Sequence, residues 1–434
     1  MITGKNYIGN QLSASGNKTF KTFNPLLNIE NQWEIIEASQ NEVNQASELA
    51  AEAFKTYSKI SGAKKAEFLR AIADEIEALG DDLLQVYSTE SGLPNGRAMG
   101  ERGRTLGQLR AFASHVENGN WVDASIDTAQ PDRKPLPKVD LRKMNVPLGP
   151  VVVFGASNFP FAFSTAGGDT AAALAAGCPV IVKSHPMHLG TGELIASAII
   201  NAAQQTGMPN GVFSNIMGRG RTVGTALVKH PKVKAVGFTG SISGGRALFD
   251  LASKREEPIP VFAEMGSINP VIITSKAIEN RSEEIASTYA GSITLGAGQF
   301  CTNPGLILTV ESDKTQRFIK DLAEKTVEID AQCMLHPSIK SGFVENGTSV
   351  SSQDGAEVVG KIQGDVEANY APSQITSVSG KDFLANPKLH QEVFGPFSLV
   401  VRAKDEAELI EIINGRQNQT SNHKQLGERR KKDQ

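Results

Sequence analysis

Apolar positions in the first third of the chain recur with the spacing of amphipathic helices. Leu69, Ile72, Ala73, Ile76 and Leu79 fall on one face of a helix drawn through residues 64–88. We therefore predict an amphipathic helix over residues 64–88 and a second helix over residues 96–116.

The pattern then changes twice. The stretch from residue 122 to 148 begins poor in large apolar groups and carries Pro131, Pro135 and Pro137, which predicts a linker or protruding arm. From residue 150, apolar runs rich in β-branched residues alternate with helical stretches. The runs cover residues 151–154, 179–182, 212–216, 233–238 and 260–263, and the helical stretches cover residues 165–176, 189–206, 222–229 and 243–254. This alternation predicts an α/β fold with a parallel, doubly wound sheet.

Strands and helices alternate again in residues 265–413, where we predict a second α/β domain. Parallel sheets of this kind bind ligands beyond the carboxyl ends of their strands. Residues 416–434 contain one large apolar residue, Leu426, and cannot pack a core, so a polar, disordered tail is expected.

Composition narrows the functional classes. The formal net charge of −3 gives no argument for a nucleic-acid partner or an anionic membrane. The one dense basic run, at residues 429–432, is typical of a solvated tail. Three cysteines do not make a disulfide framework and fit a reducing cytoplasm. No signal peptide is apparent in residues 1–20, and no apolar run approaches the ~18 residues of a membrane span.

The strongest candidate for chemistry is Cys301, within a run of small residues from Gly298 to Gly305. A thiol on such a loop can attack a carbonyl carbon, and a carboxylate can later activate water. Glu264 ends an apolar run and could supply that carboxylate, although a surface glutamate at a strand end fits the pattern equally well. The other cysteines, Cys178 and Cys333, lie in apolar surroundings and are expected to be structural.

Three further segments could bind a nucleotide or an oxyanion. Asn158 follows an apolar strand, where its amide could donate to an oxyanion or simply form a turn. The run from Phe238 to Gly245 combines a strand end, glycines and a helix start, which suits a phosphate. Lys183 ends another strand and could reach a ribose or a phosphate. His185, His188 and Glu193 match no tight metal-binding motif, so no metal is expected.

Together these segments are similar to the aldehyde dehydrogenase superfamily over residues 20–415. The similarity rests on six ordered segments: Asn158-Phe159-Pro160, Val182-Lys183, Phe238-Thr239-Gly240-Ser241 with Gly245, Glu264-Met265-Gly266, Gly298-Gln299-Phe300-Cys301 and Glu392-Val393-Phe394-Gly395-Pro396. Residues 298–305 and 104–112 most resemble the NADP-preferring 2,5-dioxopentanoate (2-oxoglutarate semialdehyde) dehydrogenases and bacterial fatty-aldehyde dehydrogenases.

The resemblance implies a domain plan. Two doubly wound, Rossmann-like domains and a small oligomerisation arm are expected. The dinucleotide-binding domain would comprise residues 1–121 and 149–264, the arm residues 122–148, the catalytic domain residues 265–415 and the tail residues 416–434. Family members continue for roughly another hundred residues, so the resemblance suggests a truncated chain with impaired stability or activity. It also leaves oligomerisation open, because the strand that pairs with the arm is expected in that further part.

The resemblance also implies roles. Cys301 would form a thiohemiacetal and then a thioester, with the oxyanion held by Asn158, and Glu264 would activate water. Lys183 would bind the adenosine ribose or its 2′-phosphate, and Glu392 would hold the nicotinamide ribose. Gly240, Ser241 and Gly245 would lie at the pyrophosphate. For a 2-oxo acid substrate, Arg104 and Arg110 are candidate carboxylate partners, although a structural salt bridge fits each of them equally well.

The expected cofactor preference follows from one position at which this chain differs from NAD-selective members of the family. Members selective for NAD often carry a glutamate three positions after the strand-end lysine, where this chain has Pro186. Arg219 and Arg221 add positive charge nearby, which favours a 2′-phosphate, so NADP is expected, with NAD possible. The alternatives are a fatty-aldehyde dehydrogenase or a non-catalytic nucleotide-binding remnant. An acylating enzyme that transfers to coenzyme A would not need Glu264.

Overall fold

The computed structural model describes residues 2–219, 221–364 and 366–420. The chain divides into two compact units, Met1–Met265 and Gly266–Gln434. Each is described by itself.

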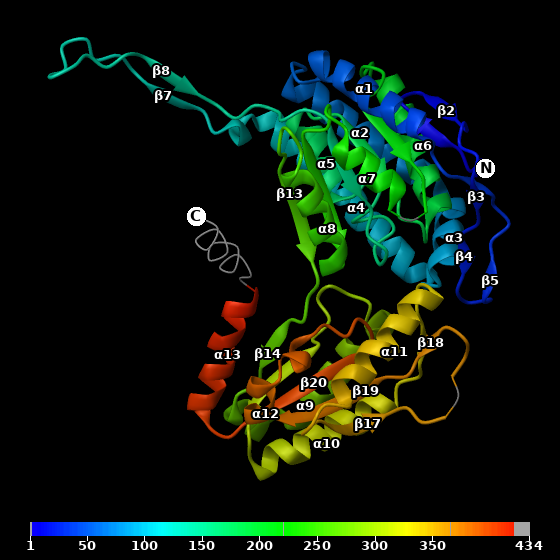
Figure 1. Ribbon diagram of the computed structural model, residues 1–434, viewed down its shortest axis with the longest axis vertical. Helices are drawn as coiled ribbons and strands as arrows, with labels where there is room; N and C mark the ends of the chain where they lie inside the picture. The colour runs from blue at the N-terminus through cyan, green and yellow to red at the C-terminus, as the bar shows by residue number, and fades with distance from the viewer. Residues whose placement is uncertain (1, 220, 365, 421–434) are drawn as a thin grey trace. The chain divides into compact units, whose positions relative to one another are not determined.

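The first unit is built on a seven-stranded sheet with the strand order β13-β12-β9-β10-β11-β1-β2 (Figure 1). The five strands from β13 to β11 are parallel, and β1 and β2 extend the sheet beyond β11 with antiparallel pairings. The strands are β1 Asn6–Ile8, β2 Gln11–Ser13, β9 Val151–Phe154, β10 Val180–Lys183, β11 Phe213–Ile216, β12 Ala235–Gly240 and β13 Val261–Met265. Small antiparallel pairs lie in the N-terminal region: β3 Thr19–Phe20 with β6 Ile35–Ile36, and β4 Phe23–Asn24 with β5 Ile29–Glu30.

Helices cover this sheet in two layers. In register across the sheet, Val152 lies beside Ile181 and Val236, and these side chains pack against α1, α7 and α8. The next residue of each strand points the other way, toward the layer that contains α5. The helices are α1 Gln40–Tyr57, α2 Gly62–Ala78, α3 Gly80–Ser91, α4 Asn95–Asn118, α5 Gly168–Ala176, α6 Leu189–Gln205, α7 Thr222–Lys229 and α8 Ile242–Ser253. The predicted parallel, doubly wound sheet is confirmed.

One predicted helix is wrong in its extent. Residues 64–88 form parts of two helices, α2 and α3, which are separated at Leu79, and Gly80 is the first residue of α3. Gly80 has a φ of 59°, in the left-handed region where a helix ends readily at glycine. The apolar spacing continues across the break, so periodicity alone could not reveal it. The helix predicted over residues 96–116 is confirmed as α4.

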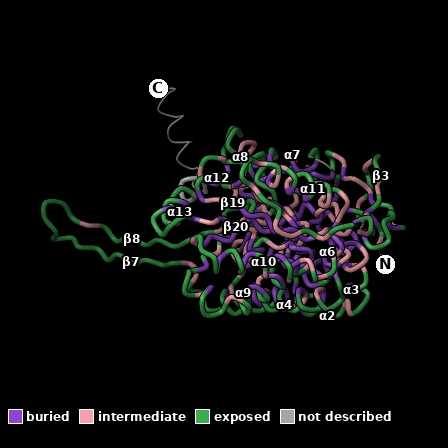
Figure 2. The backbone as a smooth tube through the Cα atoms, turned by 90° about the horizontal axis from the view of Figure 1, so that it is seen from below, coloured by how far each residue is buried: buried purple, intermediate pink, exposed green. Residues whose placement is uncertain are grey.

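Residues 122–148 contain an antiparallel ribbon of β7 Ser125–Asp127 and β8 Leu141–Lys143, which extends away from the rest of the first unit (Figure 1). Almost all of its backbone is exposed (Figure 2). Apolar side chains are exposed on both strands, including Ile126 and Leu141.

The second unit contains a five-stranded sheet with the order β14-β15-β20-β19-β17, in which only β17 is antiparallel to its neighbour. Its strands are β14 Pro270–Ile272, β15 Leu306–Val310, β17 Glu357–Lys361, β19 Gln374–Ser379 and β20 Phe397–Ala403, and β16 Gln332–Cys333 pairs with β18 Tyr370–Ala371. Its helices are α9 Ser275–Thr294, α10 Asp313–Val327, α11 Pro337–Ser351, α12 Gly380–Ala385 and α13 Glu406–Thr420.

Two apolar cores lie on opposite faces of this sheet. Ile307 and Val400 pack with residues of α9 and α10, whereas Leu306, Leu399 and Val401 pack with residues of α11, α12 and α13. This confirms the second α/β domain. The helix α13 continues to Thr420, past residue 416 where the polar tail was expected to begin. Glutamine and arginine are good helix formers, so low apolar content alone did not mark the helix end. Residues 421–434 lie outside the described part of the chain.

Candidate active site

Cys301 lies on a tight loop between α9 and β15. The loop begins with the 3-10 turn Leu295–Gly298. Gly298 has a φ of 64°, and a Cβ atom there would lie 2.2 Å from the carbonyl oxygen of Gly395. Only glycine fits this contact, which joins the cysteine loop to the segment that carries Glu392.

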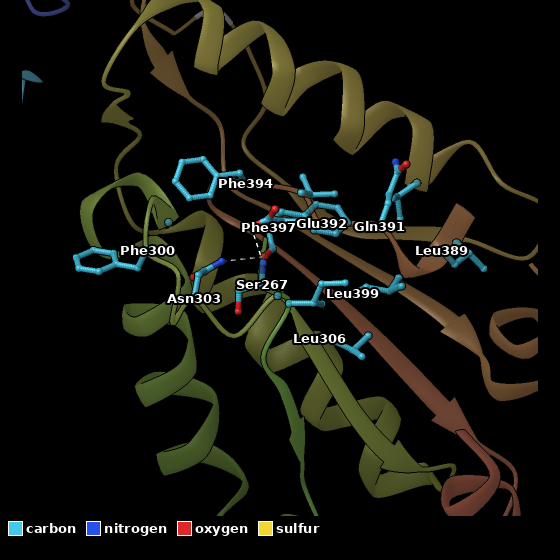
Figure 3. Close-up of a pocket in the computed structure, with 15 residues that line it drawn as sticks. Ser267, Phe300, Asn303, Leu306, Leu389, Gln391, Glu392, Phe394, Phe397 and Leu399 are labelled. Atoms are coloured by element: carbon cyan, nitrogen blue, oxygen red, sulfur yellow. Dashed lines mark hydrogen bonds between the residues drawn. The ribbon is translucent and has the colours of Figure 1, made fainter. Parts of the chain in front are cut away.

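Side-chain amides fix the loop from both sides of the thiol. Asn269 donates to the carbonyl oxygens of Cys301 (2.6 Å) and Asn303 (3.0 Å). Asn303 donates in turn to the carbonyl oxygen of Gly395 at 3.2 Å and to that of Phe397 at 3.5 Å, the second of which is drawn in Figure 3. These bonds hold the backbone of the loop. The Cys301 side chain is exposed, and its position is fixed through this backbone.

Buried Gln299 anchors the residue before Phe300. Its side chain donates to the carbonyl oxygen of Gly296 at 3.1 Å and accepts from the N–H of Leu335 at 2.9 Å. Residues 296–303 are therefore tied to three other parts of the second unit, which keeps the position of the thiol defined.

The other two cysteines differ from Cys301. Both are buried. Burial raises the pKa of the Cys178 thiol, and burial together with the charge of Glu367 raises that of Cys333 to about 11. A thiol that stays protonated is a poor nucleophile, so Cys301 is the candidate for covalent chemistry.

Glu392 lines a hollow in the second unit together with Ser267, Phe300, Asn303 and Phe394 (Figure 3). Its carboxylate accepts from the N–H of Ser267 at 3.2 Å. Burial raises the pKa of Glu392, and this hydrogen bond opposes the rise. The hollow therefore combines aromatic walls with a buried carboxylate beside the cysteine loop.

In the first unit, the loop that carries Asn158 is held by a buried carboxylate that the sequence did not single out. Glu101 of α4, 4% exposed, accepts from the N–H groups of Phe161 (2.8 Å) and Ala162 (3.0 Å). Its second oxygen accepts from the Tyr87 hydroxyl at 2.7 Å. Asn158 itself is half-buried at the carboxyl end of β9. Glu101 thus fixes the backbone next to the candidate oxyanion donor.

The two candidate substrate arginines have different surroundings. Arg110 is exposed and pairs with Asp74 (2.9 Å) and Glu77 (2.7 Å), which is the structural salt bridge considered above. Arg104 lies over the rings of Phe163 and Phe159, with its guanidinium carbon 4.9 and 5.7 Å from their centres. Only Arg104 is therefore placed against the segment that follows Asn158.

Glu264 lies on β13 opposite Thr239 of β12 and is exposed. Residues two apart on a strand point to the same face, so Glu264 shares a face with Phe262. Phe262 lines an apolar hollow with Gly237 and Asp169 of α5. Desolvation, and secondly the charge of Glu264, raise the pKa of Asp169. Glu264 is thus presented at the carboxyl end of its strand, near a second carboxylate.

The candidate phosphate segment has the expected local form. β12 ends at Gly240, and Ser241 is the N-cap of α8, where its hydroxyl accepts from the N–H of Gly244 at 3.2 Å. A Cβ atom at Gly240 would lie 2.8 Å from the Phe238 ring, and one at Gly245 would lie 2.5 Å from the Met265 side chain. Glycine therefore lets this helix start close to its neighbours and leaves its N–H groups accessible to an anion.

Lys183 ends β10 and is 7% exposed. Burial lowers the pKa of its ammonium group to about 8, and the charge of Glu37 opposes this shift. Glu37, which the sequence did not indicate, accepts from the backbone N–H of Arg219 at 2.8 Å. Arg221 lies at the N-terminus of α7. One buried cation, two exposed arginines and one carboxylate therefore surround the ends of β10 and β11.

These features fit a dinucleotide cofactor. The ammonium group of Lys183 forms no ion pair or hydrogen bond with another described residue, although a buried ammonium group is costly without a counter-charge. A phosphate or ribose would supply the missing partner, and the start of α8 would receive a pyrophosphate.

The residues considered for a metal are used elsewhere. The Nε2 atom of His188 is hydrogen bonded to the carbonyl oxygen of Ala156 at 2.8 Å, and Glu193 accepts from the N–H groups of Thr3 and Gly4. Within the described ranges, no three His, Cys, Asp or Glu side chains are grouped to hold a metal ion. The helices of the described part are all too short or too polar to cross a membrane.

Comparisons with known proteins identify the family. Residues 12–419 match the aldehyde dehydrogenase family. The chain is 47% identical over 424 residues to alpha-ketoglutaric semialdehyde dehydrogenase 2 of Azospirillum brasilense, covering 96% of this chain and 80% of that protein. It is 43% identical over 408 residues to alpha-ketoglutaric semialdehyde dehydrogenase of Acinetobacter baylyi, covering 94% and 77%. The chain belongs to the aldehyde dehydrogenase family.

Solved structures show the same fold. A NAD-dependent benzaldehyde dehydrogenase from Corynebacterium glutamicum superposes with a TM-score of 0.80 at 23% identity, covering 95% of this chain and 87% of that one. Betaine aldehyde dehydrogenase from Staphylococcus aureus gives a TM-score of 0.81 at 20% identity, covering 96% and 83%. The aldehyde dehydrogenase-like fold inferred from the six sequence segments is confirmed.

Proposed function

We propose that this protein oxidises 2-oxoglutarate semialdehyde (2,5-dioxopentanoate) to 2-oxoglutarate, with NADP preferred over NAD. The observation that carries the proposal is the cysteine loop, in which four backbone anchors present one exposed thiol while the other two thiols are buried. The substrate follows from the two relatives that are more than 40% identical, both alpha-ketoglutaric semialdehyde dehydrogenases.

In the proposed reaction the Cys301 sulfur attacks the aldehyde carbon, and the carbonyl oxygen becomes an oxyanion. Asn158 donates a hydrogen bond to this oxyanion. A nicotinamide cofactor held by Lys183, the start of α8 and Glu392 would supply the acceptor for the hydride that leaves the carbon. The substrate carbon is then an acyl group on sulfur, and Glu264 removes a proton from the water that releases the acid and restores the thiol.

The remaining roles concern binding. Lys183, Arg219 and Arg221 supply positive charge for a 2′-phosphate, which supports the preference for NADP. Gly240, Ser241 and Gly245 form the helix start for the pyrophosphate, and Glu392 accepts from a ribose hydroxyl. Arg104 is the candidate partner for the substrate carboxylate, because Arg110 is already paired with Asp74 and Glu77.

The test is reduced-cofactor formation by the purified chain. The substrates are 2,5-dioxopentanoate and a long-chain aldehyde, each with NADP and with NAD. Cys301→Ala should abolish turnover, whereas Cys333→Ala, which removes a buried thiol outside the proposed site, should retain it. Faster turnover of the long-chain aldehyde would favour the fatty-aldehyde alternative. No turnover by a chain that circular dichroism shows to be folded would favour the nucleotide-binding remnant.

A further inference from the structure

Glu37 is fixed at the edge of the sheet where a nucleotide is expected. It follows β6 and precedes Ser39, the N-cap of α1. Its neighbour Ala38 donates to the carbonyl oxygen of Met217 at 2.9 Å, and its own carboxylate accepts from the N–H of Arg219 at 2.8 Å. Two hydrogen bonds therefore hold Glu37 against the segment that follows β11.

The same edge carries Lys183. β10 and β11 are parallel with Lys183 opposite Ile216, the last residue of β11, so both strands end together. Glu37 is bonded to the residues just beyond Ile216, which places its carboxylate at the exit of both strands. The charge of Glu37 acts on the Lys183 ammonium group and opposes the effect of burial on its pKa. The hydrogen bond from Arg219 and the pairing of β10 with β11 therefore place both charged groups at the same edge of the sheet.

This arrangement changes the expected preference between NADP and NAD. The chain has Pro186 at the position where NAD-selective family members often carry a carboxylate. If that position is considered alone, only positively charged side chains are left near the expected adenosine ribose. The fold brings a carboxylate to the same region from a distant segment. A carboxylate accepts hydrogen bonds from the ribose 2′-hydroxyl and repels a 2′-phosphate.

We propose that Glu37 is a cofactor-specificity residue that accepts from the adenosine ribose hydroxyls, counteracts Lys183, Arg219 and Arg221 at a 2′-phosphate, and so allows NAD to be used beside NADP. This inference rests on the proposed function, because it requires the dinucleotide site at the ends of β10 and β11.

The experiment measures nucleotide binding without turnover. Isothermal titration calorimetry gives the dissociation constants of adenosine 2′,5′-bisphosphate and of 5′-AMP for the full chain and for Glu37→Gln. Glutamine keeps an oxygen that can accept from the N–H of Arg219, so the loop should stay in place while the charge is lost. The preference for the bisphosphate should rise about tenfold in Glu37→Gln, the scale of one close like-charge repulsion.

Two control variants test whether a change in nucleotide preference comes from the negative charge at position 37. Glu30→Gln removes one negative charge from the exposed strand β5 and should leave the preference unchanged. Glu37→Asp retains the charge and should keep the preference nearer to wild type than Glu37→Gln does. The effect of Glu37→Gln should also shrink at high salt.

The outcomes are distinct. If both nucleotides bind and Glu37→Gln changes their ratio no more than Glu30→Gln does, the specificity role is overturned and the dehydrogenase proposal stands. If neither nucleotide binds to the folded wild-type chain, the dinucleotide site is overturned together with the role of Glu37.

Discussion

Replacing Lys183 with methionine should stabilise the protein while it weakens the nucleotide site. Lys183 is 7% exposed, and burial lowers the pKa of its ammonium group from 10.5 to about 8. This change in pKa corresponds to about 3 kcal/mol. Methionine has a similar length and no charge, so it should fill the same space without this penalty.

The pH dependence gives the sharper test. Between pH 8 and 10.5 the unfolded chain keeps the Lys183 proton that the folded chain has lost, so the free energy of unfolding rises with pH in this window. The cost of the buried charge is fully present below pH 8 and disappears above pH 10.5. Lys183→Met should therefore exceed the wild type by up to about 3 kcal/mol at pH 7, and the advantage should vanish as the pH approaches 10.5.

Urea denaturation followed by circular dichroism at pH 7, 8.5 and 10 measures this difference. Comparing variant and wild type at each pH removes the contribution of all other titrating groups. Lys59→Met, which replaces an exposed lysine, should stay within about 0.5 kcal/mol at every pH. A Lys183→Met chain that is less stable than wild type at pH 7, or whose advantage does not change with pH, would show that the buried charge of Lys183 does not destabilise the fold.

Three further predictions concern the site. Glu101→Ala leaves the N–H groups of Phe161 and Ala162 unpaired and should cost about 3–5 kcal/mol in chemical denaturation, well beyond an exposed substitution. Gly298→Ala should displace the cysteine loop and change the rate of Cys301 alkylation by iodoacetamide, whereas Gly291→Ala, which meets no neighbour, should not. Glu264→Gln should retain one rapid burst of reduced cofactor per chain and lose later turnover by about 10²–10⁴-fold; an unchanged steady state would contradict its role.

The five parallel strands of the first unit were predictable because each is a short apolar run between turn-forming residues, and all five predicted runs correspond to strands. The break between α2 and α3 could not be predicted in this way. The apolar face of α2 continues in α3, and only the backbone conformation of Gly80 marks the boundary between the two helices. The small pairs of the N-terminal region were also missed, because strands of two residues are too short to show alternation.

The candidate site shows a similar division. The residues proposed to react or to contact a ligand stand in local motifs, so Cys301 and Lys183 could be found as candidates by reading along the chain. Glu101 and Asn269 act through backbone groups of distant segments, and no local pattern marks a carboxylate or an amide for that task. Their roles exist only after folding.

Glu37 is proposed to contact the cofactor, yet no local motif marks it. It shows why the absence of one motif residue is weak evidence for cofactor specificity. Proline at position 186 removes a carboxylate from one strand end, which favours a 2′-phosphate if that position is considered alone. The hydrogen bond from Arg219 brings Glu37 to the neighbouring strand end and returns a negative charge to the same region. Because Coulomb interactions depend on distance and not on order in the chain, the preference follows from the sum of charges around Lys183. A chain can thus lose the expected residue and keep its electrostatic effect.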